Sequence, residues 1–165
     1  MCGIVGYVGG NNSLEVLLGG LKRLEYRGYD SAGVAVIDSD GHIGTRKRAG
    51  KLQVLVDDLE GRPLGNGATG IGHTRWATHG GPTDRNAHPH LSADGKLALI
   101  HNGIIENFAD LKQELLDDGA TFLSETDTEV AAHLVARSFA ETGDLTEAMR
   151  LVVDRLHGAF TLLIM

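Results

Sequence analysis

The sequence Met1-Cys2-Gly3-Ile4-Val5-Gly6-Tyr7-Val8-Gly9 opens the chain, and the interpretation of the other segments depends on it. Cys2 is the only cysteine in 165 residues, and the apolar run at residues 4–8 predicts a buried strand. Removal of Met1 would leave a thiol and a free α-amine on one residue. Because such an amine titrates near pH 8, about two units below a lysine, it can act as a base at neutral pH. The stretch therefore suggests an N-terminal nucleophile, although a lone cysteine near a terminus is more often an ordinary residue.

The composition restricts the class of protein. The chain has 15 basic and 22 acidic residues and a net charge of −7, which argues against nucleic acid or an anionic membrane as the partner. No apolar run approaches the roughly 20 residues that cross a bilayer. One cysteine cannot form an internal disulfide, so a reducing, cytoplasmic location is expected. The apolar fraction of 42% is enough to build the core of one globular domain.

Strand and helix patterns are mixed along the chain. A helix is expected to open at Asn12, which Glu15 follows as in a capping box, and to end at Gly28. Further helices are expected at residues 52–59, 107–117, 126–141 and 144–156. Strands are expected at residues 4–8, 32–38, 43–48, 69–75, 96–101 and 158–165.

The order of these elements indicates the fold class. Ser39-Asp40-Gly41 between two strands is a hairpin signal, whereas other strands are separated by helices. This mixture predicts an α+β layered sandwich rather than a doubly wound parallel sheet. The long polar stretch at residues 76–95 is expected to be a functional loop. Because the last strand is followed by no closing element, we expect a domain that is cut short at its C-terminal end.

Five of the eight histidines fall between residues 73 and 101: His73, His79, His88, His90 and His101. A metal site centred on His88-Pro89-His90 is one interpretation. Zinc sites usually need three or four ligands, commonly cysteines or helix-spaced histidines, and this spacing fits poorly. Hydrogen bonding within polar loops is the commoner role for such residues. We therefore expect neither a metal nor an organic cofactor.

Three segments carry groups that suit an amino-acid substrate. Arg75 and Trp76 follow a strand end, where a guanidinium can grip a carboxylate and an indole can close a pocket, although a salt bridge and a core position are equally open. Asn102-Gly103 offers a side-chain amide beside a backbone N–H, which suits an oxyanion but is also a turn signal. Asp127 begins a helix, where it could cap the helix or hold an ammonium group.

Five blocks occur together in order: CGIVG at residues 2–6, LEYRGYDSAG at 24–33, HTRWATHG at 73–80, HNGIIEN at 101–107 and SETDTE at 124–129. Together they resemble the class II glutamine amidotransferases, and most of all the glutaminase domain of the glutamine–fructose-6-phosphate aminotransferase (glucosamine-6-phosphate synthase) branch. The resemblance implies the N-terminal-nucleophile fold, an αββα sandwich of two antiparallel sheets between helical layers. It would cover residues 1–165 as an incomplete glutaminase domain, without the sugar isomerase domains of the family.

The resemblance also implies residue roles. Cys2 would be the nucleophile, with its own α-amine as the base, and Asn102 and Gly103 would form the oxyanion hole. The residues that would bind L-glutamine are Arg75, Thr78 and His79 at the α-carboxylate, Asp127 at the α-ammonium group, and Trp76 and Gly80 in the loop that closes over the substrate.

The expected reaction is hydrolysis of L-glutamine to glutamate and ammonia through a γ-glutamyl thioester on Cys2. In the complete enzyme, expected to be a homodimer, the sugar isomerase domains would transfer the ammonia to fructose 6-phosphate. Three alternatives stay open: the glutaminase domain of another class II amidotransferase, a non-catalytic glutamine-binding module, and a histidine-based metallohydrolase.

Overall fold

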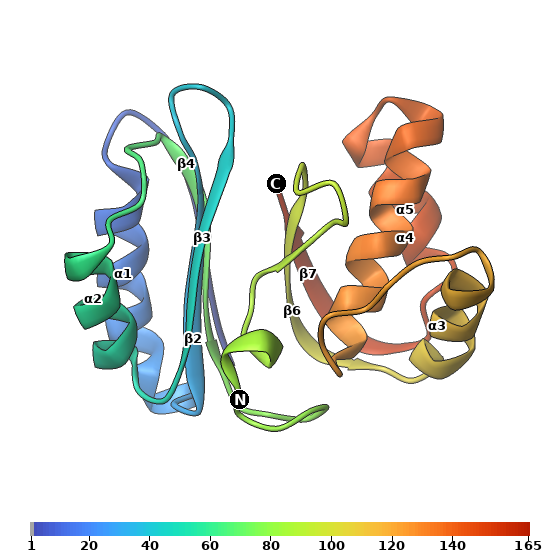
Figure 1. Cartoon of the computed structure of the whole chain (residues 1–165), viewed down its shortest axis with the longest axis horizontal. Helices are drawn as coiled ribbons and strands as arrows, with labels where there is room; N and C mark the ends of the chain where they lie inside the picture. Colours follow the sequence, from blue (N-terminus) through green and yellow to red (C-terminus); the bar gives the residue numbers. More distant parts are fainter. Residues whose placement is uncertain (1) are drawn as a thin grey trace.

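Two antiparallel sheets lie face to face, each covered on its outer face by helices, in a computed structural model that describes residues 2–165 (Figure 1). The first sheet has the order β1 (Gly3–Val8), β4 (Thr69–Arg75), β2 (Ser31–Ile37) and β3 (Ile43–Ala49). The second has the order β5 (His90–Leu91), β6 (Ala98–Ile105) and β7 (Gly158–Ile164). The predicted α+β sandwich of two antiparallel sheets is confirmed.

The helices divide between the two outer faces (Figure 1). The first sheet is covered by α1 (Ser13–Leu24) and α2 (Leu52–Gly61). The second is covered by α3 (Phe108–Asp117), α4 (Asp127–Thr142) and α5 (Leu145–Val153). Two short 3₁₀ turns, Glu25–Arg27 and Asp84–Asn86, complete the elements of the described residues. Within residues 2–165, no helix has the length and hydropathy to cross a membrane.

The β2–β3 hairpin forms where its turn residues predict it. The Asp38 carboxylate accepts the N–H groups of Asp40 at 3.0 Å and His42 at 2.9 Å, and Gly41 adopts a φ of +83° that glycine tolerates without strain. These bonds satisfy the turn, so the register of the two strands is set locally.

Three of the five α-helices within residues 2–165 begin with a side-chain cap, among them α1, where the sequence predicts one at Asn12. Asn12 accepts the N–H of Leu14, and Asp144 accepts the N–H groups of Thr146 and Glu147. Thr126 accepts the N–H of Glu129, but the Thr126 N–H donates to Ser124 Oγ and not to Glu129, so a full capping box does not form. The Glu129 carboxylate instead accepts the N–H groups of Leu123 and Ser124, which holds the loop before α4 against the helix.

The apolar core has three parts. One lies between the sheets and consists of small and branched residues, which allow a close approach: Ala35, Ile71, Ala98 and Ile100, with Ile4, Leu91 and Leu163 packed around them. The other two lie between each sheet and its helices, and they include Leu17, Leu21, Val34, Val36 and Leu55 on one side and Leu99, Ile105, Val130, Leu134 and Val152 on the other. The leucines of α1 therefore form its core face, with Leu17 and Leu21 fully buried.

Several element boundaries differ from the sequence expectation, and three of the differences concern the segments around the site. The first helix ends at Leu24, and a 3₁₀ turn covers the residues before Gly28. The polar stretch at residues 76–95 contains another 3₁₀ turn and the short β5. The strand expected at residues 96–101 runs from Ala98 to Ile105, because Asn102 and Gly103 pair with Thr161 and Phe160 of β7. The turn interpretation of Asn-Gly is therefore wrong: pairing with a distant strand overrides the local signal.

Candidate active site

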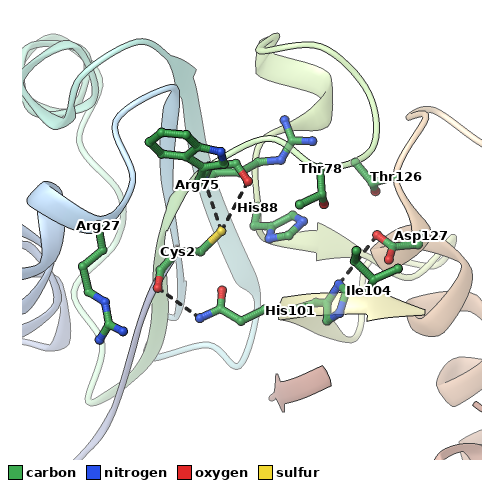
Figure 2. Close-up of a pocket in the computed structure, with 12 residues that line it drawn as sticks. Cys2, Arg27, Arg75, Thr78, His88, His101, Ile104, Thr126 and Asp127 are labelled. Atoms are coloured by element: carbon green, nitrogen blue, oxygen red, sulfur yellow. Dashed lines mark hydrogen bonds and ion pairs between the residues drawn. The ribbon is translucent and has the colours of Figure 1, made fainter. Parts of the chain in front are cut away.

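Ends of strands from both sheets and the start of α4 surround one cavity of about 410 Å³, a volume in the range of small-molecule sites (Figure 2). Cys2 precedes β1, Arg75 ends β4, Asn102 lies in β6 and Asp127 begins α4. The residues that line the cavity are Cys2, Arg27, Arg75, Trp76, Thr78, His88, His101, Asn102, Gly103, Ile104, Thr126 and Asp127.

Cys2 is placed by the register between β1 and β4. Gly3 pairs with Thr74, so the thiol of Cys2 lies beside the residues that follow Arg75. The Trp76 N–H donates to Cys2 Sγ at 3.2 Å, and the thiol lies 3.5 Å from the Trp76 carbonyl oxygen. Burial raises the pKa of the Cys2 thiol above its ordinary value, while the Trp76 N–H favours the thiolate. A base near Cys2 is therefore needed for efficient attack at neutral pH.

Asn102 connects the nucleophile to the second sheet. Its Nδ2 amide donates to the Cys2 carbonyl oxygen at 3.2 Å, and its Oδ1 lies 2.8 Å from His73 Nε2. Gly103, the next residue, has a φ of +119°, and a Cβ there would lie 2.1 Å from the Ala159 carbonyl oxygen. Only glycine fits this backbone, so the two residues proposed for an oxyanion hole are held in one rigid strand.

Asp127 presents an ionised carboxylate to the cavity. Its Oδ2 accepts the Ile105 N–H at 3.0 Å, and its Oδ1 lies 3.6 Å from His101 Nδ1 (Figure 2). Burial opposes ionisation, but the imidazole of His101 and the Ile105 N–H outweigh it, so the pKa of Asp127 is lower than usual. A buried negative charge at a cavity wall suits a substrate cation.

Arg75 is buried and engages the loop that follows it. Its guanidinium donates to the carbonyl oxygens of His79, Gly80 at 3.1 Å and Gly81 at 3.3 Å. Burial lowers the pKa of Arg75, and the charges of Asp30, Cys2 and Asp127 act in the opposite direction. The Arg75 side chain thus lines the cavity, and its guanidinium also holds residues 79–81 in place.

Nine residues were predicted for the site, and seven of them line the cavity: Cys2, Arg75, Trp76, Thr78, Asn102, Gly103 and Asp127. His79 and Gly80 do not. The His79 ring packs 4.8 Å from that of Phe108, with Nδ1 3.8 Å from Asp127 Oδ2, and Gly80 contributes its carbonyl oxygen to Arg75. These two residues therefore contact the substrate-binding candidates from outside the cavity.

Trp76 lies at the rim of the cavity. Its side chain is 49% exposed, and its ring meets that of Tyr29 edge-on with centroids 5.5 Å apart. The core alternative for Trp76 is therefore wrong. An exposed indole that also lines the cavity is well placed to cover a bound molecule.

Five lining residues were not predicted as site residues: Arg27, His88, His101, Ile104 and Thr126. Signals for them existed. Arg27 lies in the LEYRGYDSAG block, and two of the others belong to the histidine-rich region. Their convergence depends on pairing between strands that are far apart in sequence, which local patterns do not reveal.

The histidines form a buried layer rather than loop contacts. His73, His88, His90 and His101 are nearly inaccessible, and His88 Nε2 and His90 Nε2 lie 2.9 and 3.0 Å from the hydroxyls of Thr128 and Thr126. Burial lowers the pKa of His73 to about 4 and that of His90 to about 3, and it lowers the pKa of His88 well below its usual value. These three rings are therefore neutral at pH 7. The prediction that such histidines form hydrogen bonds is confirmed, but His73, His90 and His101 form them from strands.

One group of side chains within residues 2–165 brings three possible metal ligands together: Asp38, Asp40 and His42. It lies at the tip of the β2–β3 hairpin, and none of its members lines the cavity. Asp38 already accepts two backbone N–H groups there, which accounts for the arrangement as a turn.

Comparison with known proteins identifies the family. A family model described as a glutamine amidotransferase domain matches residues 57–165. The chain is 71% identical over 163 residues to the glutamine–fructose-6-phosphate aminotransferase [isomerizing] of Leifsonia xyli subsp. xyli, covering 99% of this chain and 26% of the relative. It is 65% identical over 162 residues to the protein of that name from Streptomyces coelicolor, covering 98% of this chain and 26% of the relative.

Solved structures agree with this result. A glutamine phosphoribosylpyrophosphate amidotransferase from B. subtilis, complexed with ADP and GMP, matches with a TM-score of 0.84 and 31% identity, over 100% of this chain and 35% of that one. The chain spans about a quarter of the length of the curated relatives it matches. The resemblance drawn from the five sequence blocks is confirmed: this chain belongs to the class II glutamine amidotransferase domains and has their N-terminal-nucleophile fold.

Proposed function

We propose that this chain hydrolyses L-glutamine to glutamate and ammonia, as the glutaminase domain of a glutamine–fructose-6-phosphate aminotransferase. The observation that carries the proposal is that one small cavity is lined by a thiol, an amide, a guanidinium and a carboxylate, on Cys2, Asn102, Arg75 and Asp127. These are the groups needed to attack a carboxamide and to hold the two charges of an α-amino acid.

Cys2 is the nucleophile in this proposal. Its α-amine, free once Met1 is removed, accepts the thiol proton; Met1 lies outside the described residues. The sulfur attacks the side-chain carboxamide carbon of glutamine, a C–S bond forms, and the carbonyl electron pair moves to oxygen. When the oxyanion collapses, the C–N bond breaks, and the protonated amine supplies the proton with which ammonia leaves. Water then hydrolyses the γ-glutamyl thioester to glutamate and restores the thiol.

Asn102 and Gly103 stabilise the oxyanion. One N–H of the Asn102 amide donates to the Cys2 carbonyl oxygen, which leaves the second N–H for the substrate. Since Gly103 lines the same cavity, its backbone N–H is the second donor. Donors that are fixed before the substrate binds need no reorganisation when the negative charge develops.

Arg75 and Asp127 select for an α-amino acid. The Asp127 carboxylate attracts the α-ammonium group, and the Arg75 guanidinium attracts the α-carboxylate, with Thr78 at the cavity wall. Because the guanidinium already donates to three loop carbonyls, binding of the α-carboxylate couples to the position of residues 79–81. Trp76 and Gly80 then belong to the segment that covers bound glutamine, and His79 supports Asp127.

The ammonia acceptor is proposed from the relatives. The two named above are glutamine–fructose-6-phosphate aminotransferases almost four times as long as the matched region. We therefore propose fructose 6-phosphate as the acceptor, a sugar isomerase region beyond the glutaminase domain in the intact protein, and a homodimer. Cys2 is a free thiol, which suits the reducing environment of the cytosol.

The experiment compares the wild-type chain with Cys2→Ala in an assay of glutamate release from L-glutamine. Hydrolysis is expected in the wild type and not in the variant, and intact mass after acid quench should reveal a γ-glutamyl adduct on the wild type alone. Equal hydrolysis by the two proteins would end the proposal. Glutamine binding without an adduct from an electrophilic glutamine analogue would indicate a binding module, and loss of activity with a chelator would indicate a metallohydrolase. Formation of glucosamine 6-phosphate by the intact protein tests the acceptor.

A further inference from the structure

The Asn102 side chain is held at both ends of its amide. Nδ2 donates to the Cys2 carbonyl oxygen at 3.2 Å, and Oδ1 lies 2.8 Å from Nε2 of His73, which is completely buried on β4. Since the carbonyl oxygen of Cys2 can only accept, the amide nitrogen must face it, and the amide oxygen must face His73. An oxygen cannot donate, so His73 Nε2 carries the hydrogen and donates it to Asn102.

This assignment fixes the protonation of the next ring. The one hydrogen on His73 Nε2 goes to Asn102 Oδ1 at 2.8 Å, and His88 Nδ1, 3.4 Å from the same nitrogen, faces that N–H and therefore carries no hydrogen of its own. Neutral His88 then carries its own hydrogen on Nε2 and donates it to the Thr128 hydroxyl at 2.9 Å. The rings of His73 and His88 lie with centroids 4.4 Å apart, and both residues are buried. His73 therefore donates to the Asn102 amide, while His88, which donates to Thr128 of α4, packs against the His73 ring and holds it in place.

We propose that His73 is a positioning residue for the glutaminase reaction: braced by His88, it holds the Asn102 amide with its N–H groups towards the reacting carbonyl. The inference rests on the proposed function and adds a residue that does not line the cavity. Without the Nε2–H donor, the amide could rotate and present its oxygen to the developing oxyanion, which would repel it. The bond from Nδ2 to Cys2 alone does not prevent this rotation. After rotation the amide oxygen could accept a hydrogen bond from water, and the energy lost with one neutral hydrogen bond is small.

The test uses the purified full-length protein and two substitutions of one residue. His73→Gln keeps an N–H donor at the reach of Nε2, whereas His73→Phe keeps a planar ring and removes the donor. For His73→Phe we expect kcat for glutamine hydrolysis to fall by more than about tenfold, up to the 10²–10³ that loss of an oxyanion donor costs, with KM little changed. His73→Gln should recover most of the wild-type kcat. His133→Phe is the matched control, since this buried histidine on α4 packs against Phe122 away from the cavity.

Alkylation of Cys2 by iodoacetamide separates positioning from damage to the fold. That reaction forms a C–S bond and expels iodide at a saturated carbon, so no oxyanion needs a donor. His73→Phe should therefore keep the wild-type alkylation rate while losing glutamine turnover. A parallel loss of both would overturn the inference, as would a fall in activity in His73→Gln equal to that in His73→Phe. His73→Leu, closer to imidazole in volume, replaces the Phe variant if circular dichroism shows that variant unfolded.

A double-mutant comparison tests the route through Asn102. If His73 acts only by orienting that amide, Asn102→Ala combined with His73→Phe should be no slower than Asn102→Ala alone. Multiplied losses would mean that His73 acts elsewhere and would overturn the inference. Glutamate release by the wild type is measured first: its absence refutes the proposed function, whereas an active wild type with unaffected His73 variants refutes this inference alone.

Discussion

The side-chain amide of Asn102 donates a 3.2 Å hydrogen bond to the carbonyl oxygen of Cys2, which ties the second sheet to the residue that carries the thiol. The two residues are 100 positions apart in sequence: Asn102 lies in β6 of the second sheet, and Cys2 immediately precedes β1 of the first. Asn102 is the proposed oxyanion donor, and it also bonds the backbone of the nucleophile Cys2. This bond therefore sets the distance between the attacking sulfur and the oxyanion that the attack creates. We base the first prediction on this bond.

Replacement of Asn102 by Ala should lower kcat for glutamine hydrolysis by about 10²–10³ with little change in KM, because the lost donor acts on the transition state. Steady-state kinetics of glutamate release measures both constants. Asn102→Asp serves as a second variant. Its carboxylate cannot donate to an oxyanion, so a rate near that of the wild type would contradict the assignment.

Replacement of Arg75 by Lys should raise KM for glutamine by roughly 10- to 100-fold, the equivalent of losing one charge-assisted hydrogen bond, and should lower kcat less. An ammonium group keeps the charge but cannot donate in a planar fork to several carbonyls and a carboxylate. Because Arg75 also holds residues 79–81, the thermal midpoint should fall as well. If Arg75→Lys lowers the thermal midpoint but leaves KM for glutamine unchanged, Arg75 only holds residues 79–81 and does not bind the substrate.

Replacement of Asp127 by Asn should raise KM for glutamine by roughly 10- to 100-fold, because one charged partner of the ammonium group is lost. The amide oxygen of Asn can still accept the Ile105 N–H, so the helix start and the fold should be preserved. Isothermal calorimetry with the Cys2→Ala protein measures the affinity without turnover. Equal glutamine affinity of the Cys2→Ala protein with and without Asp127→Asn would show that Asp127 only positions β6 against α4.

The free energy of unfolding should fall as the pH drops below about 6.5. His73 and His90 have folded-state pKa values of about 4 and about 3, and the pKa of His88 is also well below normal. Unfolded imidazoles titrate near pH 6.5, so below that pH the unfolded chain binds protons that the buried rings of the folded chain do not bind. Each such histidine then costs on the order of 1.4 kcal/mol per pH unit, and the full stability is present only above 6.5.

Urea unfolding followed by circular dichroism measures how the free energy of unfolding changes with pH. The relevant range is about pH 7.5 to 5, in which the histidines of the unfolded chain titrate. Carboxylates contribute little there, because Asp127 and Glu129 have lowered pKa values and titrate at more acidic pH. His90→Gln should reduce the slope by about one histidine's share, near 1.4 kcal/mol per pH unit. A midpoint that does not change over this range would contradict the burial of neutral rings.

Replacement of Gly103 by Ala should destabilise the fold by about 3 kcal/mol or more, because the new Cβ would meet the Ala159 carbonyl at a φ that disfavours side chains. Gly19→Ala is the control of opposite sign. It lies within α1 with no atom near its missing Cβ, and alanine in a helix stabilises by roughly 0.5–1 kcal/mol. Thermal midpoints of the two variants should move in opposite directions, and a shift of Gly103→Ala towards higher stability would refute the conclusion that only glycine fits this backbone.

Local sequence signals predicted the elements whose causes are local. The β2–β3 hairpin is set by the Asp38 turn, and α1 by its leucine spacing and the Asn12 cap. The extension of β6 through Asn102 and Gly103 was missed, because it depends on pairing with β7 more than fifty residues later. β5 was also missed, since two residues carry no periodicity.

The sequence singled out Cys2, Arg75 and Asp127, and the family resemblance gave each a role. These side chains line one cavity, and their roles in it stay predictions. What the sequence could not give was the histidine layer. Whether His73 or His88 lies in a solvated loop or in a dry core is decided by the packing of one sheet against another, and no spacing within either segment encodes it.

The antiparallel register of β1 with β4 has a consequence for biosynthesis. Gly3 finds its partner Thr74 only after some seventy further residues have been made, and Asn102 and Asp127 come later still. A ribosome-bound chain thus exposes its thiol long before the walls around that thiol exist. Under the proposed function, a nascent chain therefore gains the ability to cleave glutamine only after residue 127 has been made, when all the cavity walls can form.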